Sequence, residues 1–288
     1  MSTIFERVSL FRSHLEKYGE SKISKIIGYV GFTMRKFLFS VLSIGPIPEH
    51  VAIIMDGNRR FAKRRTFLRD GTDSASGHRL GFRSLISTIQ YCYEMGVKCV
   101  TVYAFSIDNF NRSPQEVQLL MDLMKEKMEE MLAEESVLKS LDVKINFWGN
   151  LELLTEPALL TAKRAMDTTM HNKGPVLSVC VAYTSTNEIK HAIEASVRDS
   201  KGQGQVEVSD LERNLYSAGC VEPDIIIRTS GETRLSNFLL WQSDFSHLQN
   251  PKQLWPEFSL RHLVFAVLDY QLVYAYLKKR KEKIEKNK

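Results

Sequence analysis

The segment from Met55 to Phe61 combines the residue types that bind phosphate groups. Its sequence is Met-Asp-Gly-Asn-Arg-Arg-Phe, and it directly follows an apolar run. Backbone N–H groups of the Gly57-Asn58 turn and the guanidinium groups of Arg59 and Arg60 can hold phosphate oxygens. Asp56 can hold a divalent cation that bridges those oxygens. The alternative is a tight turn whose arginines only face solvent.

A second arginine-rich segment extends from Arg228 to Phe238. Its sequence is Arg-Thr-Ser-Gly-Glu-Thr-Arg-Leu-Ser-Asn-Phe, again directly after an apolar run. Arg228, Arg234 and the neighbouring hydroxyl groups suit a second phosphate site, and Glu232 could neutralise or orient an arginine. Two separate anion sites predict two phosphorylated substrates.

A third polar segment, Tyr103–Arg112, carries aromatic residues. It could offer hydrogen bonds and a cation beside an apolar ligand. The alternative is a loop that only caps the next helix, which Ser113 and Pro114 mark with a suitable N-cap and first position. Four methionines beyond it recur at helical spacing: Met121, Met124, Met128 and Met131. They suit either an ordinary core or the wall of a site for a flexible apolar ligand.

Each polar segment follows a short apolar run that suits a buried parallel strand. The expected strands are His50–Met55, Val97–Phe105, Val143–Trp148, Val176–Tyr183 and Asp224–Arg228. The expected helices are Gly77–Met95, Ser113–Leu141, Thr155–His171, Ser185–Ser200 and Ser259–Lys286. Strands that alternate with helices predict an α/β fold with a central parallel sheet covered by helices. Its ligands are expected at the carboxyl ends of the strands.

The net charge of +5 is concentrated in residues 277–288, which hold seven Lys/Arg and two Glu. The rest of the chain is neutral, so we expect no nucleic acid partner. The basic end suits a solvated helix end, or contact with a partner or an anionic membrane. The four cysteines show no CxxC spacing, which argues against a zinc site or a disulfide framework and favours a reducing compartment.

The segment Ile23–Ile47 is apolar but is interrupted by Lys25, Arg35 and Lys36. Two adjacent cations near its middle argue against a membrane-spanning helix. We expect residues 1–45 to form an amphipathic helical segment that lies on a membrane or caps an apolar tunnel, with a plain core helix as the alternative. Residues 46–288 are expected to form a single catalytic domain.

Four stretches of the chain together resemble the motifs of one enzyme family. They are His50–Lys63, Gly77–Gly81, Tyr103–Arg112 and Ile227–Gln242. In order and spacing they are similar to the cis-prenyltransferases, which include undecaprenyl diphosphate synthases, dehydrodolichyl diphosphate synthases and rubber-type enzymes. The Asn-Arg-Arg-Phe and Thr-Ser-Gly-Glu variants look like the eukaryotic branch.

This resemblance implies an activity and a setting for it. A cis-prenyltransferase condenses isopentenyl diphosphate onto an allylic diphosphate, here expected to be farnesyl diphosphate, and uses Mg²⁺. The product would be a polyprenyl diphosphate for dolichol or a related polyisoprenoid, held in an apolar tunnel as it grows. The implied location is the cytosolic face of the endoplasmic reticulum membrane, with peripheral contact.

The resemblance also implies roles for the matching residues. Asp56 would be catalytic and hold Mg²⁺, and Asn109 would be the second catalytic residue, although a neutral amide is a poor base. The allylic diphosphate would be surrounded by Gly57, Asn58, Arg59, Arg60 and His78, with Phe61 packed beside it. The meeting point of the two substrates would be bordered by Ser106, Asn109, Phe110 and Arg112. Isopentenyl diphosphate would be bound by Arg228, Arg234 and Ser236.

Three departures from the family pattern qualify these roles. His247 stands where many bacterial members carry a metal-binding Glu. The stretch Thr66–Ser76 is longer than in bacterial relatives, so no arginine is assigned from it. No glycine follows Gly231, whereas self-sufficient members end in an Arg-x-Gly segment that reaches across a dimer. We therefore expect a hetero-oligomer in which a non-catalytic relative supplies that segment.

Two other functions compete with this assignment. One is a non-catalytic family partner that acts as an interaction protein, against which Asp56 and both arginine-rich segments argue. The other is an unrelated phosphate-binding hydrolase, but the chain contains neither a G-x-S-x-G motif nor a P-loop motif. The trans-type prenyltransferases use paired aspartates, and the chain has no Asp-Asp pair.

Overall fold

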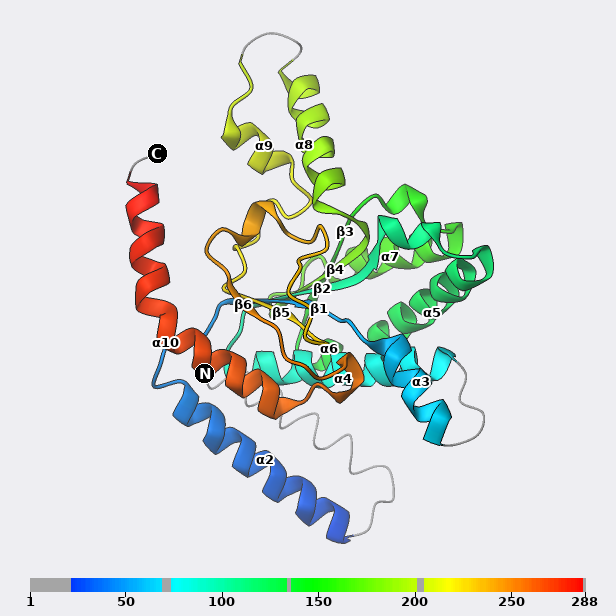
Figure 1. Cartoon of the computed structure of the whole chain (residues 1–288), viewed down its shortest axis with the longest axis vertical. Coiled ribbons are helices and arrows are strands. Elements are labelled where there is room, and N and C mark those ends of the chain that lie inside the picture. Colours follow the sequence, from blue (N-terminus) through cyan, green and yellow to red (C-terminus); the bar gives the residue numbers. More distant parts are fainter. Residues whose placement is uncertain (1–21, 69–73, 134–135, 201–204, 287–288) are drawn as a thin grey trace.

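A six-stranded parallel sheet organises the computed structural model, which describes residues 22–68, 74–133, 136–200 and 205–286 (Figure 1). The strand order is β3-β4-β2-β1-β5-β6. The strands are β1 His50–Ile54, β2 Cys99–Ser106, β3 Lys144–Trp148, β4 Val176–Tyr183, β5 Ile225–Arg228 and β6 His247–Gln249. The five predicted strands and the fold class are confirmed. The edge strand β6 was not predicted, because three residues with the sequence His-Leu-Gln form no apolar run.

Helices cover both faces of the sheet. They are α2 Lys22–Leu42, α3 Asn58–Leu68, α4 Ser74–Met95, α5 Pro114–Leu132, α6 Val137–Ser140, α7 Glu156–Thr169, α8 Ser185–Asp199, α9 Val208–Asn214 and α10 Leu260–Glu285. The prediction of one helix over Ser113–Leu141 is wrong. The helix α5 ends at Leu132, and the Ser136 side chain caps the separate helix α6 by accepting from the N–H of Leu138.

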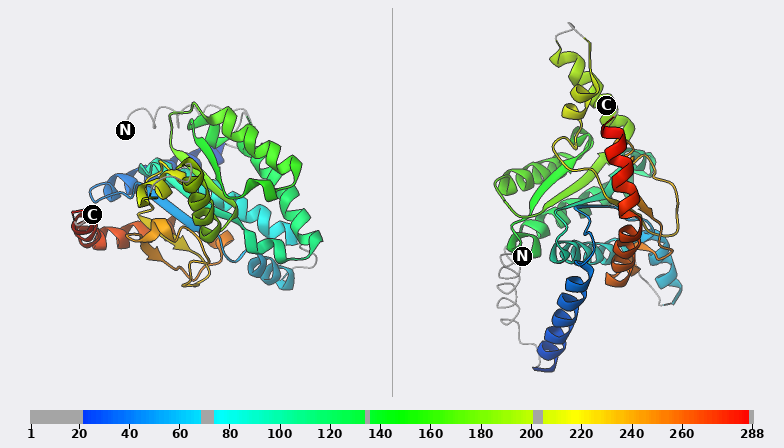
Figure 2. Two further views of the ribbon diagram at one scale, coloured as in Figure 1. Left: turned by 90° about the horizontal axis from the view of Figure 1, so that it is seen from above. Right: turned by 90° about the vertical axis from the view of Figure 1, so that its left-hand side faces the viewer.

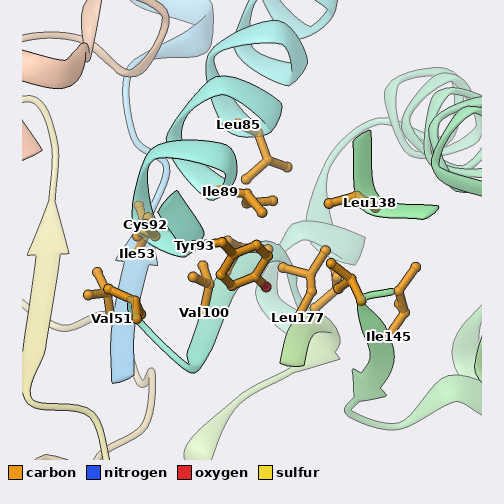
Figure 3. Packing of buried hydrophobic residues seen from close by; sticks show 14 of the residues in the cluster. Val51, Ile53, Leu85, Ile89, Cys92, Tyr93, Val100, Leu138, Ile145 and Leu177 are labelled. Carbon is orange, nitrogen blue, oxygen red and sulfur yellow. The ribbon is translucent and has the colours of Figure 1, made fainter. Parts of the chain in front are cut away.

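The central strand β1 shows how the sheet serves two cores. Val51 and Ile53 point into the larger core, where Leu85, Ile89 and Tyr93 of α4 pack against the sheet (Figure 3). Each such fully buried aliphatic side chain stabilises the fold by about 1.5–3 kcal/mol. The intervening Ala52 and Ile54 point to the opposite face, because side chains alternate along a strand.

The opposite face of the sheet is covered partly by the second arginine-rich segment itself. Phe238 is fully buried and stacks on Tyr103 of β2, with ring centroids 4.7 Å apart, and packs edge-on against Tyr183 of β4. Burial of this aromatic ring anchors the far end of the segment that begins at Arg228. The segment is therefore folded back over the ends of three strands.

The register of the strands brings the polar segments together. Ile54 of β1 pairs with Tyr103 of β2 on one side and with Arg228 of β5 on the other. Because all strands are parallel, the segments that follow β1, β2 and β5 leave the sheet at the same edge. This edge is where the sequence predicts the ligand site.

The helix α2 lies against α4 and extends away from the sheet, in the direction opposite to the α8–α9 pair (Figures 1 and 2). Arg35 joins the two helices through Glu94, with 2.6 Å between Nε and Oε2. Met34, Phe37 and Val41 of α2 are exposed. Among the described residues, no helix combines the length and apolarity needed to cross a membrane.

Candidate active site

Asp56 lies at the centre of a charged cluster at the carboxyl ends of β1 and β5. Its Oδ2 accepts a hydrogen bond from Nη2 of Arg228 at 2.9 Å, and its Oδ1 accepts from Nη2 of Arg60 at 3.2 Å. Arg228 ends β5, and Arg60 lies in the first turn of α3. The structure thus unites the two arginine-rich segments that lie far apart in the sequence.

The turn that carries Asp56 is tightly fixed. The carbonyl oxygen of Asp56 accepts hydrogen bonds from the hydroxyls of Thr229 and Ser230 and from the N–H of Trp255, at 2.7, 2.9 and 2.9 Å. Gly57 has a φ of +111°, and a Cβ there would lie 2.5 Å from the Ser230 hydroxyl oxygen. Only glycine suits both the conformation and this close approach.

The helix α3 begins at Asn58, immediately after this turn. The first N–H groups of a helix have no partner within the helix and favour bound anions. The side chains of Arg59 and Arg60 are half exposed or more at the same helix end. The predicted combination of backbone and guanidinium donors is therefore present, although both arginines also contact carboxylates of the chain.

Asp56 and Arg228 hold their charges in a partly buried setting. Burial raises the pKa of Asp56, but hydrogen bonds and charge from Arg228 and Arg60 outweigh that effect and lower it below its ordinary value of 3.8. Arg228 is 5% exposed, and its Nη1 donates to the Arg234 carbonyl and to the Ser236 hydroxyl, each at 2.6 Å. Its buried Nε has no hydrogen-bond partner among the described residues, a feature that points to a ligand site.

The segment after Arg228 stores backbone strain. Ser230, Ser236 and Asn237 have positive φ values of 75°, 49° and 59°, which residues other than glycine rarely adopt. Backbone hydrogen bonds from Ser230 to Gln253 and from Gly231 to Pro251 hold the segment. Strain that the surroundings enforce in this way is typical of ligand-binding loops.

Arg234 is the exposed arginine of this segment. Its side chain is 63% exposed and pairs with Glu232, which also lies 3.5 Å from Nη2 of Arg60. Glu232 therefore bridges the two arginine-rich segments, in agreement with the prediction that it neutralises or orients an arginine. Arg234 is free to turn toward a ligand at low cost, because exposed ion pairs contribute little.

The third polar segment forms a short 3₁₀ helix, Ile107–Asn111, at the end of β2. The Ser106 hydroxyl accepts from the N–H of Asp108, and the Asn109 side-chain oxygen accepts from the N–H of Ser106 at 3.1 Å. The segment thus caps its own 3₁₀ helix, whereas the predicted alternative was that it caps the next helix, whose N-cap is Ser113. The Asn109 amide nitrogen is left to donate elsewhere. Arg112 donates to Glu116 at 3.0 Å.

These polar segments form the rim of a cavity of about 530 Å³. We call Asp56, Arg59, Arg60, Arg112, Arg228 and Arg234 the charged rim. The deeper wall is apolar and is supplied by β2, α4 and α5, including Val102, Leu85 and Met124. Met128 and Met131 line the cavity and are also buried in the core, whereas Met121 is buried in the core without lining the cavity. One cavity therefore joins an anion-binding mouth to an apolar interior.

Comparison with known proteins identifies the family. A family model for undecaprenyl diphosphate synthases, a group of prenyltransferases, matches residues 54–276. The chain belongs to this prenyltransferase family. It is 45% identical to a dehydrodolichyl diphosphate synthase of Solanum lycopersicum, over 93% of this chain and 99% of the relative. It is 39% identical to the human dehydrodolichyl diphosphate synthase complex subunit, over 86% and 74% of the two chains.

A solved structure of a related enzyme has the same fold. Lavandulyl diphosphate synthase from Lavandula x intermedia, in complex with dimethylallyl diphosphate, superposes with a TM-score of 0.70. It is 29% identical and covers 78% of this chain and 95% of the solved chain. The relatives are cis-prenyltransferases, so the resemblance to that family is confirmed. The charged rim is intact here, which favours the enzyme over the non-catalytic partner.

Three residues to which the family pattern drew attention, Phe61, Phe110 and His247, do not line the cavity of this prenyltransferase, and a fourth, His78, cannot be placed. The side chain of His78 lies outside the described residues, although its backbone belongs to α4. Phe61 is half-buried on α3 and does not line the cavity, and Phe110 packs against Phe105 with centroids 4.9 Å apart. His247 pairs in register with Ile225, the first residue of β5, and lies 3.0 Å from Asp269. It is therefore at the opposite end of β5 from Arg228.

The donor set at Asp56 fits a magnesium ion that is bound mainly by phosphate oxygens. Mg²⁺ commonly uses one or two carboxylates together with substrate phosphates and water. Asp56 is the one carboxylate among the described residues that line the cavity, and it is ionised and partly exposed. No group of three potential metal ligands occurs in the described part of the chain. The protein thus offers one ligand, and a diphosphate would have to offer others.

Apart from the methionines of α5, the sequence did not single out the helix residues that line the cavity. Phe82, Leu85 and Lys127 lie in the wall, and Trp255 closes it by donating from Nε1 to the Gly81 carbonyl at 2.8 Å. Helical spacing assigns apolar residues to a buried face, but the same spacing describes a packed core and a cavity wall. The one distinguishing signal was a lysine within the apolar stripe of α5.

Proposed function

We propose that this chain is the catalytic subunit of a cis-prenyltransferase that condenses isopentenyl diphosphate onto an allylic diphosphate. One observation carries the proposal: the charged rim and the apolar interior belong to a single cavity. A prenyl diphosphate has a doubly phosphorylated head and a hydrocarbon tail, and this cavity matches both. The proposed product is a polyprenyl diphosphate for dolichol or a related polyisoprenoid.

The first turn of α3 is assigned to the allylic diphosphate, through Gly57, Asn58, Arg59 and Arg60. The reaction breaks the bond between the allylic carbon and the diphosphate oxygen, and the electron pair leaves with the diphosphate. Donors that already point at this leaving group stabilise the developing charge without reorganising. Arg60 is well placed for this task, because it already contacts Asp56 at the helix end.

The strained segment after β5 is assigned to isopentenyl diphosphate, through Arg228, Arg234 and Ser236. The buried Arg228 fixes the position of Ser236, while the exposed Arg234 can close on the phosphate. The alkene of this substrate forms the new carbon–carbon bond and then loses a proton. We assign proton acceptance to a diphosphate oxygen, with Ser106 and Asn109 orienting the groups, because a neutral amide is a poor base.

Asp56 is proposed to hold Mg²⁺ on a diphosphate. When bound, the cation neutralises negative charge on the phosphate oxygens. The hydrogen bonds of Arg228 and Arg60 keep Asp56 ionised, so its carboxylate is available as a ligand at neutral pH.

Incorporation of radiolabelled isopentenyl diphosphate tests the function. The full chain is incubated with farnesyl diphosphate and Mg²⁺, alone and together with a catalytically silent relative of the family, and the products are sized. Labelled chains longer than the primer are expected. If neither condition yields such chains, the proposed function is wrong.

We also propose that a non-catalytic relative completes the enzyme. The human relative carries the description of a complex subunit, and the charged rim is exposed on the surface of the single chain at Arg234 and Arg59. The chain alone is expected to show little activity, and addition of the relative should raise it. Robust long-chain synthesis by the highly purified single chain would contradict the need for a partner.

We further propose peripheral association with the cytosolic face of the endoplasmic reticulum membrane. The exposed apolar residues of α2, namely Met34, Phe37 and Val41, support this, together with the neighbouring exposed Lys36. A hydrocarbon product makes such proximity useful. Co-localisation of the full chain with a resident protein of that membrane tests the location, and a uniform cytosolic distribution would contradict it.

A further inference from the structure

Two of the four cysteines lie close together at the amino end of the sheet. Cys99 begins β2 and pairs in register with His50, the first residue of β1. It points to the same face of the sheet as Thr101, two residues along, which bonds to Nε2 of His50. Nδ1 of His50 donates to the carbonyl oxygen of Val221 at 2.6 Å, and this contact holds the preceding residue, Cys220, over the same face.

The thiols of Cys99 and Cys220 are hydrogen-bonded to each other. Both residues are half-buried, and both thiols are free in the structure. A sulfur–sulfur bond is about 2 Å long, so its formation requires the two residues to move closer. The turn before Cys220 leaves room for this movement. Gly219 has a φ of +76°, and no atom of a described residue beyond its chain neighbours lies within 4 Å of the place that a Cβ would occupy.

The two thiols differ in acidity. A thiol reacts as its thiolate, so a lowered pKa makes a cysteine more reactive. The hydrogen bond from Cys99, together with one from the N–H of Val221, outweighs burial and lowers the pKa of Cys220. The same thiol contact, with burial, raises the pKa of Cys99. Cys220 is therefore the attacking thiol of the pair, and Cys99 stays protonated beside it.

The other two cysteines lack these properties. Cys92 and Cys180 are fully buried. Burial raises the pKa of Cys92 to about 12 and also raises the pKa of Cys180. Buried thiols in apolar surroundings are unreactive. Cys99 and Cys220 are thus the one reactive pair that the described part of the chain offers.

We infer that Cys99 and Cys220 are a redox modification site, at which hydrogen peroxide produces a reversible disulfide. The Cys220 thiolate attacks one peroxide oxygen and is oxidised to a sulfenic acid, and the other oxygen leaves as hydroxide and takes up a proton to form water. The Cys99 thiol then attacks the sulfenic sulfur, and a second water leaves with the thiol proton. Two thiols and one peroxide thus give one disulfide and two waters, and a thiol reductant reverses the reaction.

The disulfide would connect β2 to the loop that leads into β5. These strands are not neighbours, because β1 lies between them. A bond between residues 99 and 220 closes a long loop of chain and so restricts the unfolded state more than the folded state. We therefore expect the oxidised chain to resist unfolding better than the reduced chain. The inference does not depend on the proposed function, because the pair lies at the end of the sheet opposite to the charged rim.

Peptide mapping without reductant tests the inference. The reduced full chain is treated with hydrogen peroxide, its remaining thiols are alkylated, and the monomer from a non-reducing gel is cleaved with trypsin. Cleavage after lysine and arginine places the four cysteines on four peptides, residues 84–98, 99–112, 174–190 and 214–228. We expect peptides 99–112 and 214–228 to be linked, and dithiothreitol to separate them. If the folded chain gives no linked peptides, or mainly links that include Cys92 or Cys180, the inference is wrong.

Serine variants test the order of attack. Cys99→Ser keeps a hydrogen-bond donor beside Cys220 but removes the second thiol, so the Cys220 sulfenic acid should persist and react with dimedone. Cys220→Ser should take up at least about five-fold less dimedone, because the remaining Cys99 thiol is protonated. Thermal unfolding checks each variant, and alanine replaces serine in a variant that fails to fold. Equal labelling of the two variants would overturn the assignment of Cys220 as the attacking thiol.

Urea unfolding tests the consequence of the link. The unfolding midpoint of the wild type should rise after peroxide treatment and return to its starting value with dithiothreitol. Cys92→Ala is the matched control, because it removes a thiol outside the pair and should show the same reversible rise. Cys220→Ser should show none. A midpoint that is unchanged or lower in the linked wild type would contradict the stabilising role of the disulfide.

Discussion

The polar groups at the amino and carboxyl ends of the central strands differ in how they are hydrogen-bonded within the chain. At the amino end, His50 is buried, with Nδ1 donating to the Val221 carbonyl at 2.6 Å and Nε2 accepting from Thr101 at 2.7 Å. Asp224 beside it accepts from the N–H groups of Glu49 and His50 and from the Tyr270 hydroxyl. Each of these polar groups has found its partners within the chain.

The carboxyl end of the same strands is built differently. Asp56 pairs with two arginines, and the Nε of Arg228 has no partner in the part of the chain that the structure describes. The loop after β5 is strained at Ser230 and Ser236. At the amino end the buried Ser178 hydroxyl, in register with Thr101, also lacks a partner among the described residues, so the contrast rests on the titratable groups: His50 and Asp224 are fully paired, whereas Arg228 is not. The contrast indicates that the carboxyl end is arranged for a ligand, and the following predictions test that contrast.

The largest effect is expected from Asp56→Asn. This change keeps the side-chain shape and removes the charge that both arginines and the proposed metal require. We expect the condensation rate to fall at least about 100-fold, as when a single electrostatic group is removed from an active site. Steady-state incorporation assays measure this, and thermal unfolding checks the fold. Asp122→Asn, on the exposed face of α5, should be silent; near-wild-type turnover by Asp56→Asn would remove Asp56 from the mechanism.

A smaller and more selective effect is expected from Arg234→Ala. Loss of a charge-assisted hydrogen bond costs about 1.5–3 kcal/mol, or roughly 10- to 150-fold. The KM for isopentenyl diphosphate should rise by that order, and the KM for the allylic primer should rise much less. Arg213→Ala is the control, because Arg213 is a similarly exposed arginine paired with a nearby carboxylate on α9. Equal increases for both substrates would show that the two phosphate sites were divided wrongly.

A change at the amino end of the strands should alter the pH dependence of the free energy of unfolding rather than substrate binding. Burial lowers the pKa of His50 from 6.5 to about 4, so the unfolded chain binds more protons than the folded chain between these values. The free energy of unfolding should therefore fall as the pH drops from 6.5 toward 4, by roughly 3 kcal/mol at the limit. The pKa of Asp56 is lowered, so the contribution of Asp56 to the pH dependence of unfolding lies largely below this pH range. Urea unfolding of the wild type and His50→Gln measures the difference, and identical pH slopes would contradict the assignment.

The smallest effect is expected at α2, which belongs to neither end of the sheet. Replacement of Met34, Phe37 and Val41 by Gln should reduce flotation with anionic liposomes several-fold, because binding scales with buried apolar area. A triple Gln variant at the exposed Leu153, Leu160 and Met170 serves as the control for lost apolar surface elsewhere. Equal flotation of the two variants would leave α2 without a special role at membranes.

The sequence allowed prediction of the sheet and of the charged rim, for a physical reason. Continuous apolar runs such as Val176–Tyr183 identify buried parallel strands, and parallel strands bring Asp56 and Arg228 to one edge whatever their separation in sequence. Direct contact between these two residues also requires that β1 and β5 be neighbours in the sheet. The periodicity of apolar residues in the sequence does not give this strand order. The break before α6 was missed because one cap at Ser136 competes with an otherwise continuous helical pattern.

The interior of the site was less predictable. Methionines of α5 divide between the core, where Met121 lies, and the cavity wall, where Met124 lies. Both positions are apolar and face inward, so only the packing of neighbouring helices distinguishes them. His247 shows the reverse case, in which motif alignment drew attention to a residue that the fold places at the amino end of β5.

Binding of inorganic diphosphate tests the contrast between the two ends most directly, because it requires neither a partner nor turnover. Titration calorimetry of the full chain with diphosphate and Mg²⁺ is compared for the wild type, Arg60→Gln at the carboxyl end and Lys98→Gln at the amino end, where Lys98 pairs with Glu49. The carboxyl-end variant is expected to bind about 10-fold more weakly or worse, and the amino-end variant should bind as the wild type does. Equal weakening by both substitutions, or by neither, would contradict the placement of the diphosphate site at Asp56 and Arg60.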